Sequence, residues 1–202
     1  MYKVTVGVCT GGTIRTETVT SLIGAMDTLR ANGVTLDFIG RIGGYVAVNR
    51  NALVKAAQDN GSTHLMFVDN DQTFKPSAMQ RLLDHDKDIV CAPYNARPAP
   101  GQPLVSVVKM MDENGDLPMD GSHRDFELGA GLNKIGASGT GFMLIKMSVF
   151  DKLKRPYFVE WQDENDEHHT EDVDFCIKAR KAGFDVWCDP TIPVGHIATV
   201  EV

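Results

Sequence analysis

The stretch from His64 to Phe74, HLMFVDNDQTF, decides the fold that we predict for this chain of 202 residues. Leu65–Val68 form an unbroken apolar run, which is typical of a strand buried on both faces of a parallel sheet. The run ends abruptly at Asp69, Asn70 and Asp71. Because open α/β sheets bind ligands at the carboxyl ends of their strands, the two carboxylates mark a candidate binding site.

The spacing of Asp69 and Asp71 has two interpretations. Hard oxygen ligands one residue apart suit Mg²⁺ or Mn²⁺ when substrate phosphates also hold the ion. A solvated turn at a strand end would carry the same residues, and Asp-x-Asp also begins at Asp84, Asp86 and Asp172. Only the pair at Asp69 directly follows a buried-strand pattern, so it alone is a candidate metal site.

The composition describes an ordinary soluble globular protein, with 43% hydrophobic and 23% charged residues. The net charge of −7 argues against a general nucleic-acid binder and against adhesion to anionic membranes. A nucleotide substrate stays compatible with this charge, because one metal ion and a few basic residues can neutralise a diphosphate. No apolar run approaches the roughly 20 residues that span a bilayer, and the N-terminus has a strand pattern and lacks that of a signal peptide. We therefore expect a cytoplasmic protein without an integral membrane segment.

Strand and helix patterns alternate through the first part of the chain. The expected strands are Lys3–Cys9, Val34–Ile39, His64–Val68 and Asp88–Ala92, and the helices between them cover Val19–Leu29, Asn49–Asp59 and the stretch after Lys75-Pro76-Ser77. This βαβαβαβ order predicts an α/β fold in which helices flank a mostly parallel, doubly wound central sheet. The chain contains neither GxGxxG nor GxxxxGK[ST], which disfavours a dinucleotide dehydrogenase and a P-loop NTPase.

Prolines and glycines change the character of the chain from Pro93 onward. Residues 104–116 suggest a hairpin or two edge strands, a small antiparallel segment. The glycine-rich stretch 121–136 is a candidate mobile flap over a site. Further strands are expected at Phe142–Ile145, Phe184–Cys188 and Thr191–Ile197, with a short helix at Ser148–Lys154.

A well-marked helix begins after Thr170, which is a plausible N-cap. Glu171 and Asp172 lie in its first turn, where the helix dipole favours carboxylates. Such acids can serve only to start the helix, or they can act as proton acceptors at neutral pH.

Four segments in this order carry a family resemblance: the strand with Asp-Asn-Asp, then SGTGFMLIK, TEDVDFCIKARKAGF and PVGHI. The chain resembles the nucleotide-sugar-dependent glycosyltransferases of the GT-A fold, in particular the inverting family 2 and its minimal bacterial and viral relatives. The resemblance covers essentially the whole chain. It implies a single domain over residues 1–202, with a nucleotide-binding half at 1–92 and an acceptor and catalytic half at 93–202.

The resemblance implies a metal and nucleotide site. Asp71 would bind Mn²⁺ or Mg²⁺ directly, and Asp69 would hold the ribose or a metal-bound water, with Asn70 between them in the same site. His196 looks like the additional metal ligand of a subset of these enzymes. The donor would be a UDP- or GDP-sugar, and its leaving diphosphate needs a cation as Lewis acid.

The resemblance also implies residues for the reaction and for the substrates. Asp172 matches the general base of an inverting enzyme, and Glu171 is the fallback. Thr10 lies where the fold admits the nucleoside base, and Arg50 would meet the nucleotide or diphosphate. Substrate contacts would come from Arg97, Gly139, Thr140 and Trp161. The acceptor would be a sugar, a lipid-linked molecule or a protein, and the stereochemical outcome stays open because the histidine ligand also recurs in retaining families.

Two rival interpretations stay open. LMFVDNDQT also fits the haloacid-dehalogenase motif, in which Asp69 would be a phosphoryl-accepting nucleophile and Asp71 an acid/base. That superfamily carries the motif on its first strand and its last acidic pair after another buried strand. The non-enzymatic alternative is a degenerate domain that binds a nucleotide sugar or a protein partner. It would be favoured if Asp71, Asp172 and His196 did not converge in space.

Overall fold

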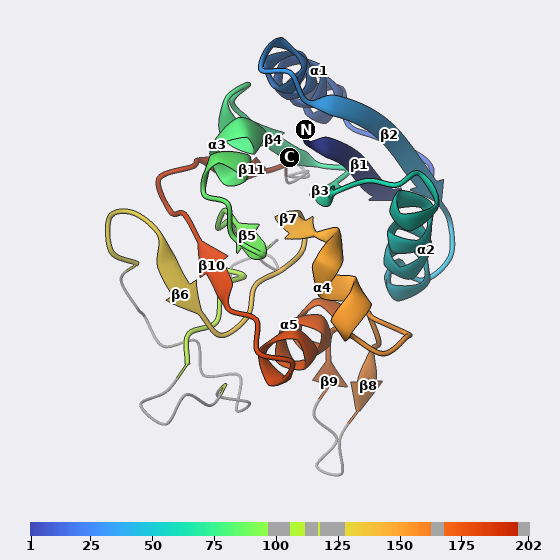
Figure 1. Ribbon diagram of the computed structural model, residues 1–202, viewed down its shortest axis with the longest axis vertical. Helices are drawn as coiled ribbons and strands as arrows, with labels where there is room; N and C mark the ends of the chain where they lie inside the picture. Colours follow the sequence, from blue (N-terminus) through green and yellow to red (C-terminus); the bar gives the residue numbers. More distant parts are fainter. Residues whose placement is uncertain (97–105, 112–116, 118–127, 163–167, 198–202) are drawn as a thin grey trace, which may run out of the picture.

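A seven-stranded sheet with helices on both faces forms the centre of the computed structural model, which describes residues 1–96, 106–111, 117, 128–162 and 168–197 (Figure 1). The strand order is β2-β1-β3-β7-β5-β10-β6. The strands are β1 (Lys3–Thr10), β2 (Thr35–Ile42), β3 (His64–Asp69), β5 (Ile89–Cys91), β6 (Asn133–Ile135), β7 (Phe142–Lys146) and β10 (Val186–Cys188). The later part of the chain therefore adds β7, β10 and β6 to the sheet that the first 92 residues begin, while the roles of the two halves stay a prediction.

The sheet is mixed but mostly parallel. β2, β1 and β3 pair in parallel, and β10 is parallel to β5. β7 lies between β3 and β5 and runs antiparallel to both, and β6 is antiparallel to β10. The α/β prediction is confirmed. The succession of strands was only partly predictable, because the sequence pattern identifies β7 as a buried strand without showing that it enters between β3 and β5.

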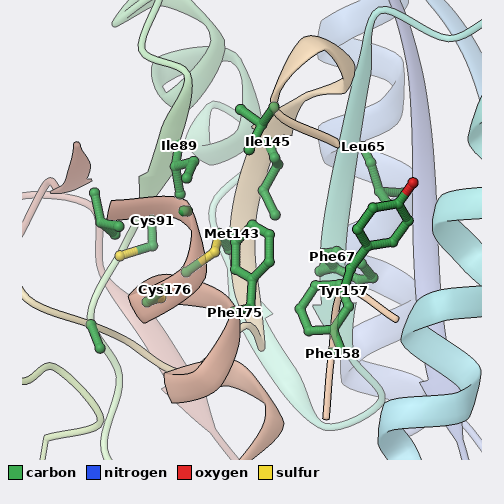
Figure 2. Packing of buried hydrophobic residues seen from close by; sticks show 14 of the residues in the cluster. Leu65, Phe67, Ile89, Cys91, Met143, Ile145, Tyr157, Phe158, Phe175 and Cys176 are labelled. Carbon is green, nitrogen blue, oxygen red and sulfur yellow. The ribbon is translucent and has the colours of Figure 1, made fainter. Parts of the chain in front are cut away.

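Five helices flank the sheet within the described residues: α1 (Thr16–Ala31), α2 (Val46–Asp59), α3 (Ala78–Asp84), α4 (Met147–Lys152) and α5 (Glu171–Lys181). β3 is buried on both faces, as its unbroken apolar run predicts. Leu65 and Phe67 pack on one side with α2, α4 and α5, where Phe158 stacks on Phe175 (Figure 2). Met66 and Val68 pack on the other side with α1 and α3.

Two short ladders lie outside the central sheet: β4 (Gln72–Phe74) pairs with β11 (Val194–His196), and β8 (Trp161–Gln162) pairs with β9 (His168–His169). β4 was not predicted from the sequence. It is important because His196 lies opposite Gln72, which brings the end of the described chain beside Asp71.

The irregular stretch after Pro93 is described only in part. Residues 112–116 of the predicted hairpin lie outside the described residues, while Asn95 bridges Ser106 and Lys109 bridges Ala137. Residues 121–127 of the predicted flap are also outside the described residues. The flap prediction is wrong for Asn133–Ile135, because these residues form β6 on β10. Across the described ranges, no helix combines the length and the apolar character needed to cross a membrane.

Candidate active site

A cavity of about 550 Å³ opens where β1 and β3 end, the edge of the sheet at which a ligand was predicted. Seven of the residues singled out from the sequence line it: Thr10, Arg50, Asp69, Asn70, Asp71, Glu171 and His196. They come from five parts of the chain, namely the ends of β1 and β3, helix α2, the start of α5, and β11. The fold therefore brings distant segments to one place.

Thr10 and Asn70 tie the loop after β1 to the acidic turn after β3. The Asn70 side-chain amide donates to the Thr13 carbonyl at 2.8 Å and to the Thr10 hydroxyl at 3.4 Å. The Thr10 hydroxyl in turn donates to the Thr13 carbonyl and accepts from the Gly12 amide. Both side chains thus shape the loop, and both residues line the cavity.

Asp71 and His196 form the most informative pair in the cavity. His196 Nδ1 lies 2.8 Å from the Asn95 carbonyl oxygen, and a carbonyl only accepts, so Nδ1 carries a proton and donates it. Nε2 lies 3.2 Å from Asp71 Oδ1. In the neutral imidazole, Nε2 would therefore turn a lone pair toward a carboxylate oxygen. A cation between or beside the two atoms, either a proton or a metal ion, removes this conflict.

The donor set fits a divalent metal whose coordination a substrate completes. Metal-binding histidines commonly donate the second ring N–H to a backbone carbonyl, as His196 does to Asn95. In the part of the chain that is described, no three His, Cys, Asp or Glu side chains are arranged to hold a metal ion by themselves. Mg²⁺ typically takes one or two carboxylates together with substrate phosphates and waters. Asp71 and His196 could hold such an ion when a diphosphate supplies further oxygens.

Arg50 joins two acidic elements of the site. Its guanidinium makes a close ion pair with Glu171 and lies 3.5 Å from Asp69 Oδ1, and only 6% of its side chain is exposed. Burial alone would lower the pKa of Arg50, but the charges of Asp69 and Glu171 raise it above its usual value. Burial raises the pKa of Glu171, and Arg50 opposes only part of this effect. The predicted nucleotide-binding arginine is thus engaged by two carboxylates and holds α5 to the end of β3.

We expect Arg50→Met to lower the free energy of unfolding by about 3–5 kcal/mol at pH 8, because it leaves the buried Glu171 and the half-buried Asp69 without a counter-charge. The loss should be smaller near pH 5. Without Arg50 the pKa of Glu171, already raised, rises further, so the folded state binds more protons than the unfolded chain and stability falls as the pH rises. Denaturant unfolding at both pH values measures the effect.

Arg30→Met is the matched control for this substitution. Arg30 pairs with Asp27 at 3.1 Å on the surface of α1, with about half of its side chain exposed. Removing it should cost less than about 0.5 kcal/mol at either pH. Equal losses for the two variants at pH 8 would show that Arg50 does not stabilise the fold through its ion pairs.

The two acids at the start of α5 occupy different positions. Glu171 lines the cavity, whereas Asp172 is half-buried outside the cavity lining. Asp172 Oδ1 accepts from the Thr170 hydroxyl and from the Val173 amide, so this oxygen helps to begin the helix. Its charge still contributes to the raised pKa of Arg50, a residue of the cavity lining.

Tyr94 is a cavity residue that the sequence analysis missed. It lines the cavity, its hydroxyl accepts from the Gly141 amide at 2.9 Å, and its ring meets His196 edge-on with centroids 5.6 Å apart. A Cβ on Gly141 would lie 2.5 Å from both Asp69 Oδ2 and the Tyr94 hydroxyl, and one on Gly139 would lie 2.4 Å from that hydroxyl. The glycines therefore make room for Tyr94 and Asp69. Nothing in the residue pattern around Tyr94 indicated this contact.

The remaining predicted substrate residues lie away from the cavity wall or outside the described residues. Gly139 and Thr140 do not line the cavity, and Thr140 is fully buried with no hydrogen-bond partner for its hydroxyl among the described residues. Trp161 is 41% exposed on β8 and stacks on His169 with centroids 3.9 Å apart. Arg97 is outside the described residues.

Comparisons with known proteins bear on the fold. No protein family and no curated protein matches the sequence. Among solved structures, A197 from STIV is similar with a TM-score of 0.60 at 18% identity, over 98% of this chain and 87% of that chain. HddC from Yersinia pseudotuberculosis matches with a TM-score of 0.46 at 11% identity, over 98% of this chain and 94% of that chain. The likeness to A197 shows a shared fold.

Proposed function

We propose that the protein is a metal-dependent glycosyltransferase that moves a sugar from a UDP- or GDP-sugar to an acceptor. One observation carries the proposal: Asp71 and His196, far apart in the sequence, meet at 3.2 Å in a cavity at the carboxyl ends of the strands. The pair fits a divalent ion, Mn²⁺ or Mg²⁺, with Asp69 and Arg50 alongside.

The proposed roles follow from the positions of the side chains. The ion, when bound by Asp71 and His196, would supply Lewis-acid stabilisation of the leaving diphosphate. Arg50 keeps Asp69 and Glu171 in place, and Asp69, which lines the cavity, would hold the ribose or a metal-bound water. Asp172, in the first turn of α5, takes the proton from the acceptor hydroxyl as the general base.

Trp161 offers an exposed aromatic face of the kind on which a sugar ring can stack. A sugar, a lipid-linked molecule or a protein could each present the acceptor hydroxyl. An inverting reaction is expected if Asp172 is the base, because the base then acts on the face opposite the leaving group.

The rival interpretations fit the geometry less well. Asp69 ends the third strand in chain order, after two strand–helix units, and Glu171 begins a helix after the β8–β9 ladder, neither of which suits the dehalogenase motif. For a degenerate binding domain the outcome is mixed. Asp71 and His196 converge, whereas Asp172 lies outside the cavity lining.

Calorimetric titration with UDP and GDP, each with and without Mn²⁺, tests the proposal. We expect micromolar binding of one nucleotide that requires the metal ion, about −8 kcal/mol at 1 μM. Absence of binding for both nucleotides, together with Mg²⁺-dependent release of phosphate from a generic phosphate ester, would replace the transferase with the phosphatase.

A further inference from the structure

β2 is one of the two edge strands of the central sheet, and no described strand pairs with its outer side (Figure 1). It has eight residues and no proline, and its side chains include Phe38, 46% exposed, and Ile42, 73% exposed. A long edge strand with unpaired backbone groups and apolar side chains is a ready site for another strand.

The backbone of β2 shows which groups are free for such a partner. Thr35 N donates to Tyr2 O and Gly43 N donates to Thr10 O, each at 3.0 Å, so the N–H groups of odd-numbered residues point toward β1. The backbone N–H and C=O groups of successive residues in a strand point to opposite sides of it. Those of the even-numbered residues 36 to 42 therefore point outward, away from β1. A second strand must match its own outward groups to these four residues.

We propose that β2 pairs with β2 of a second copy of this chain, antiparallel about a two-fold axis at Ile39. Only even-numbered residues present hydrogen-bonding groups outward, so each even-numbered residue must face an even-numbered residue of the partner. The two-fold axis therefore passes through a residue and not between two residues. Axes at Phe38 and at Ile39 then give the longest overlaps of the eight-residue strand. The side chains decide between these two registers.

With the axis at Ile39, three kinds of complementary pairs form at once, each of them twice. Asp37 lies opposite the partner's Arg41, a pair of opposite charges at a position where facing side chains approach closely. Phe38 lies opposite the partner's Gly40, where no side chain obstructs the ring. Leu36 lies opposite the partner's Ile42. With the axis at Phe38, Asp37 would instead face the partner's Ile39.

The charges of Asp37 and Arg41 also favour the register with the axis at Ile39. Within its own chain, Asp37 is held by Lys3, with Nζ 3.1 Å from Oδ2. Arg41 is exposed and makes no ion pair with any described residue. The pairing supplies Arg41 with a carboxylate and joins the two sheets into one, an isologous contact of the kind that closed dimers use.

Sedimentation equilibrium of the full chain, from about 1 to 100 μM, tests the proposal. We expect a mass at high concentration of twice the 22.1 kDa of the chain. Arg41→Asp should weaken the dimer by at least about tenfold, because it turns two attractive pairs into repulsive ones. Gly40→Pro should also weaken it, because it removes an outward N–H without touching the bonds to β1.

The double exchange Asp37→Arg with Arg41→Asp tests the register. It should weaken the dimer less than Arg41→Asp alone does, since the opposite charges again face each other across the axis, while the ion pair of position 37 with Lys3 is lost. Lys154→Glu also replaces a positive by a negative charge, at an exposed residue outside β2, and should leave the dimer intact. Circular dichroism of each variant serves to check that it is folded. A monomer at every concentration would overturn the proposal, as would a dimer that neither Arg41→Asp nor Gly40→Pro weakens. A double exchange that binds no better than Arg41→Asp alone would overturn the register.

Discussion

Asp71→Asn should abolish the metal-dependent part of nucleotide binding while leaving the protein folded. Asp71 is almost fully buried in the cavity and faces His196, so the substitution keeps the shape of the side chain and removes the charge that attracts the ion. Loss of an outer-shell partner of a metal ligand typically costs 10–100-fold in metal affinity, so loss of a ligand itself should cost more than about 100-fold. Titration of the variant with the nucleotide in the presence and absence of Mn²⁺ measures the difference.

Asp84→Asn is the matched control for Asp71→Asn. Asp84 also begins an Asp-x-Asp sequence, but it lies at the end of α3, where its carboxylate accepts from the Gln80 side chain. It should bind nucleotide and Mn²⁺ as the unchanged protein does. His196→Gln should reproduce the loss seen in Asp71→Asn. If Asp71→Asn kept its Mn²⁺-dependent affinity, the metal site would have to lie elsewhere.

The part of the site that follows from strand ends was predictable from the sequence. Asp69 and Asp71 were found because an unbroken apolar run ends at them, and the parallel pairing of β3 with β1 then brings Thr10 to the same edge. Arg50 was also expected in the site, but its partners were not. Its ion pair with Glu171 joins residues 121 positions apart, and no local pattern reports which distant carboxylate a buried arginine meets.

The rest of the site depends on pairings that the sequence does not determine. β4 is too short to give a strand pattern, yet its pairing with β11 is what places His196 beside Asp71. β7 was recognised as a strand, but its insertion beside β3 is a matter of topology, and it is this neighbour that brings Gly141 against Asp69 and Tyr94. A glycine before a strand predicts a turn equally well, so the close contact was visible only in three dimensions.

Asp172→Asn should separate binding from transfer. The amide keeps an oxygen at the position of Oδ1, so the hydrogen bonds from Thr170 and Val173 that begin α5 can persist. Nucleotide affinity should then stay within about twofold of the unchanged protein, since the change corresponds to less than about 0.5 kcal/mol. Turnover should fall by about 10²–10⁴-fold, the usual contribution of a general base, because an amide cannot accept the acceptor proton. Release of nucleoside diphosphate from the donor, measured with acceptor in excess, reports the turnover.

Asp174→Asn and Glu171→Gln distinguish a catalytic role of Asp172 from a general effect of charge near α5. Asp174 lies in the same first turn and pairs with Lys178 at 2.6 Å away from the cavity lining, so its variant should keep turnover within about threefold. Glu171→Gln removes the partner of Arg50 and should lower stability more than it lowers turnover of the folded fraction. Full turnover in Asp172→Asn, with turnover lost in folded Glu171→Gln, would instead identify Glu171 as the base. Its position in the cavity wall and its raised pKa would then be the properties that matter.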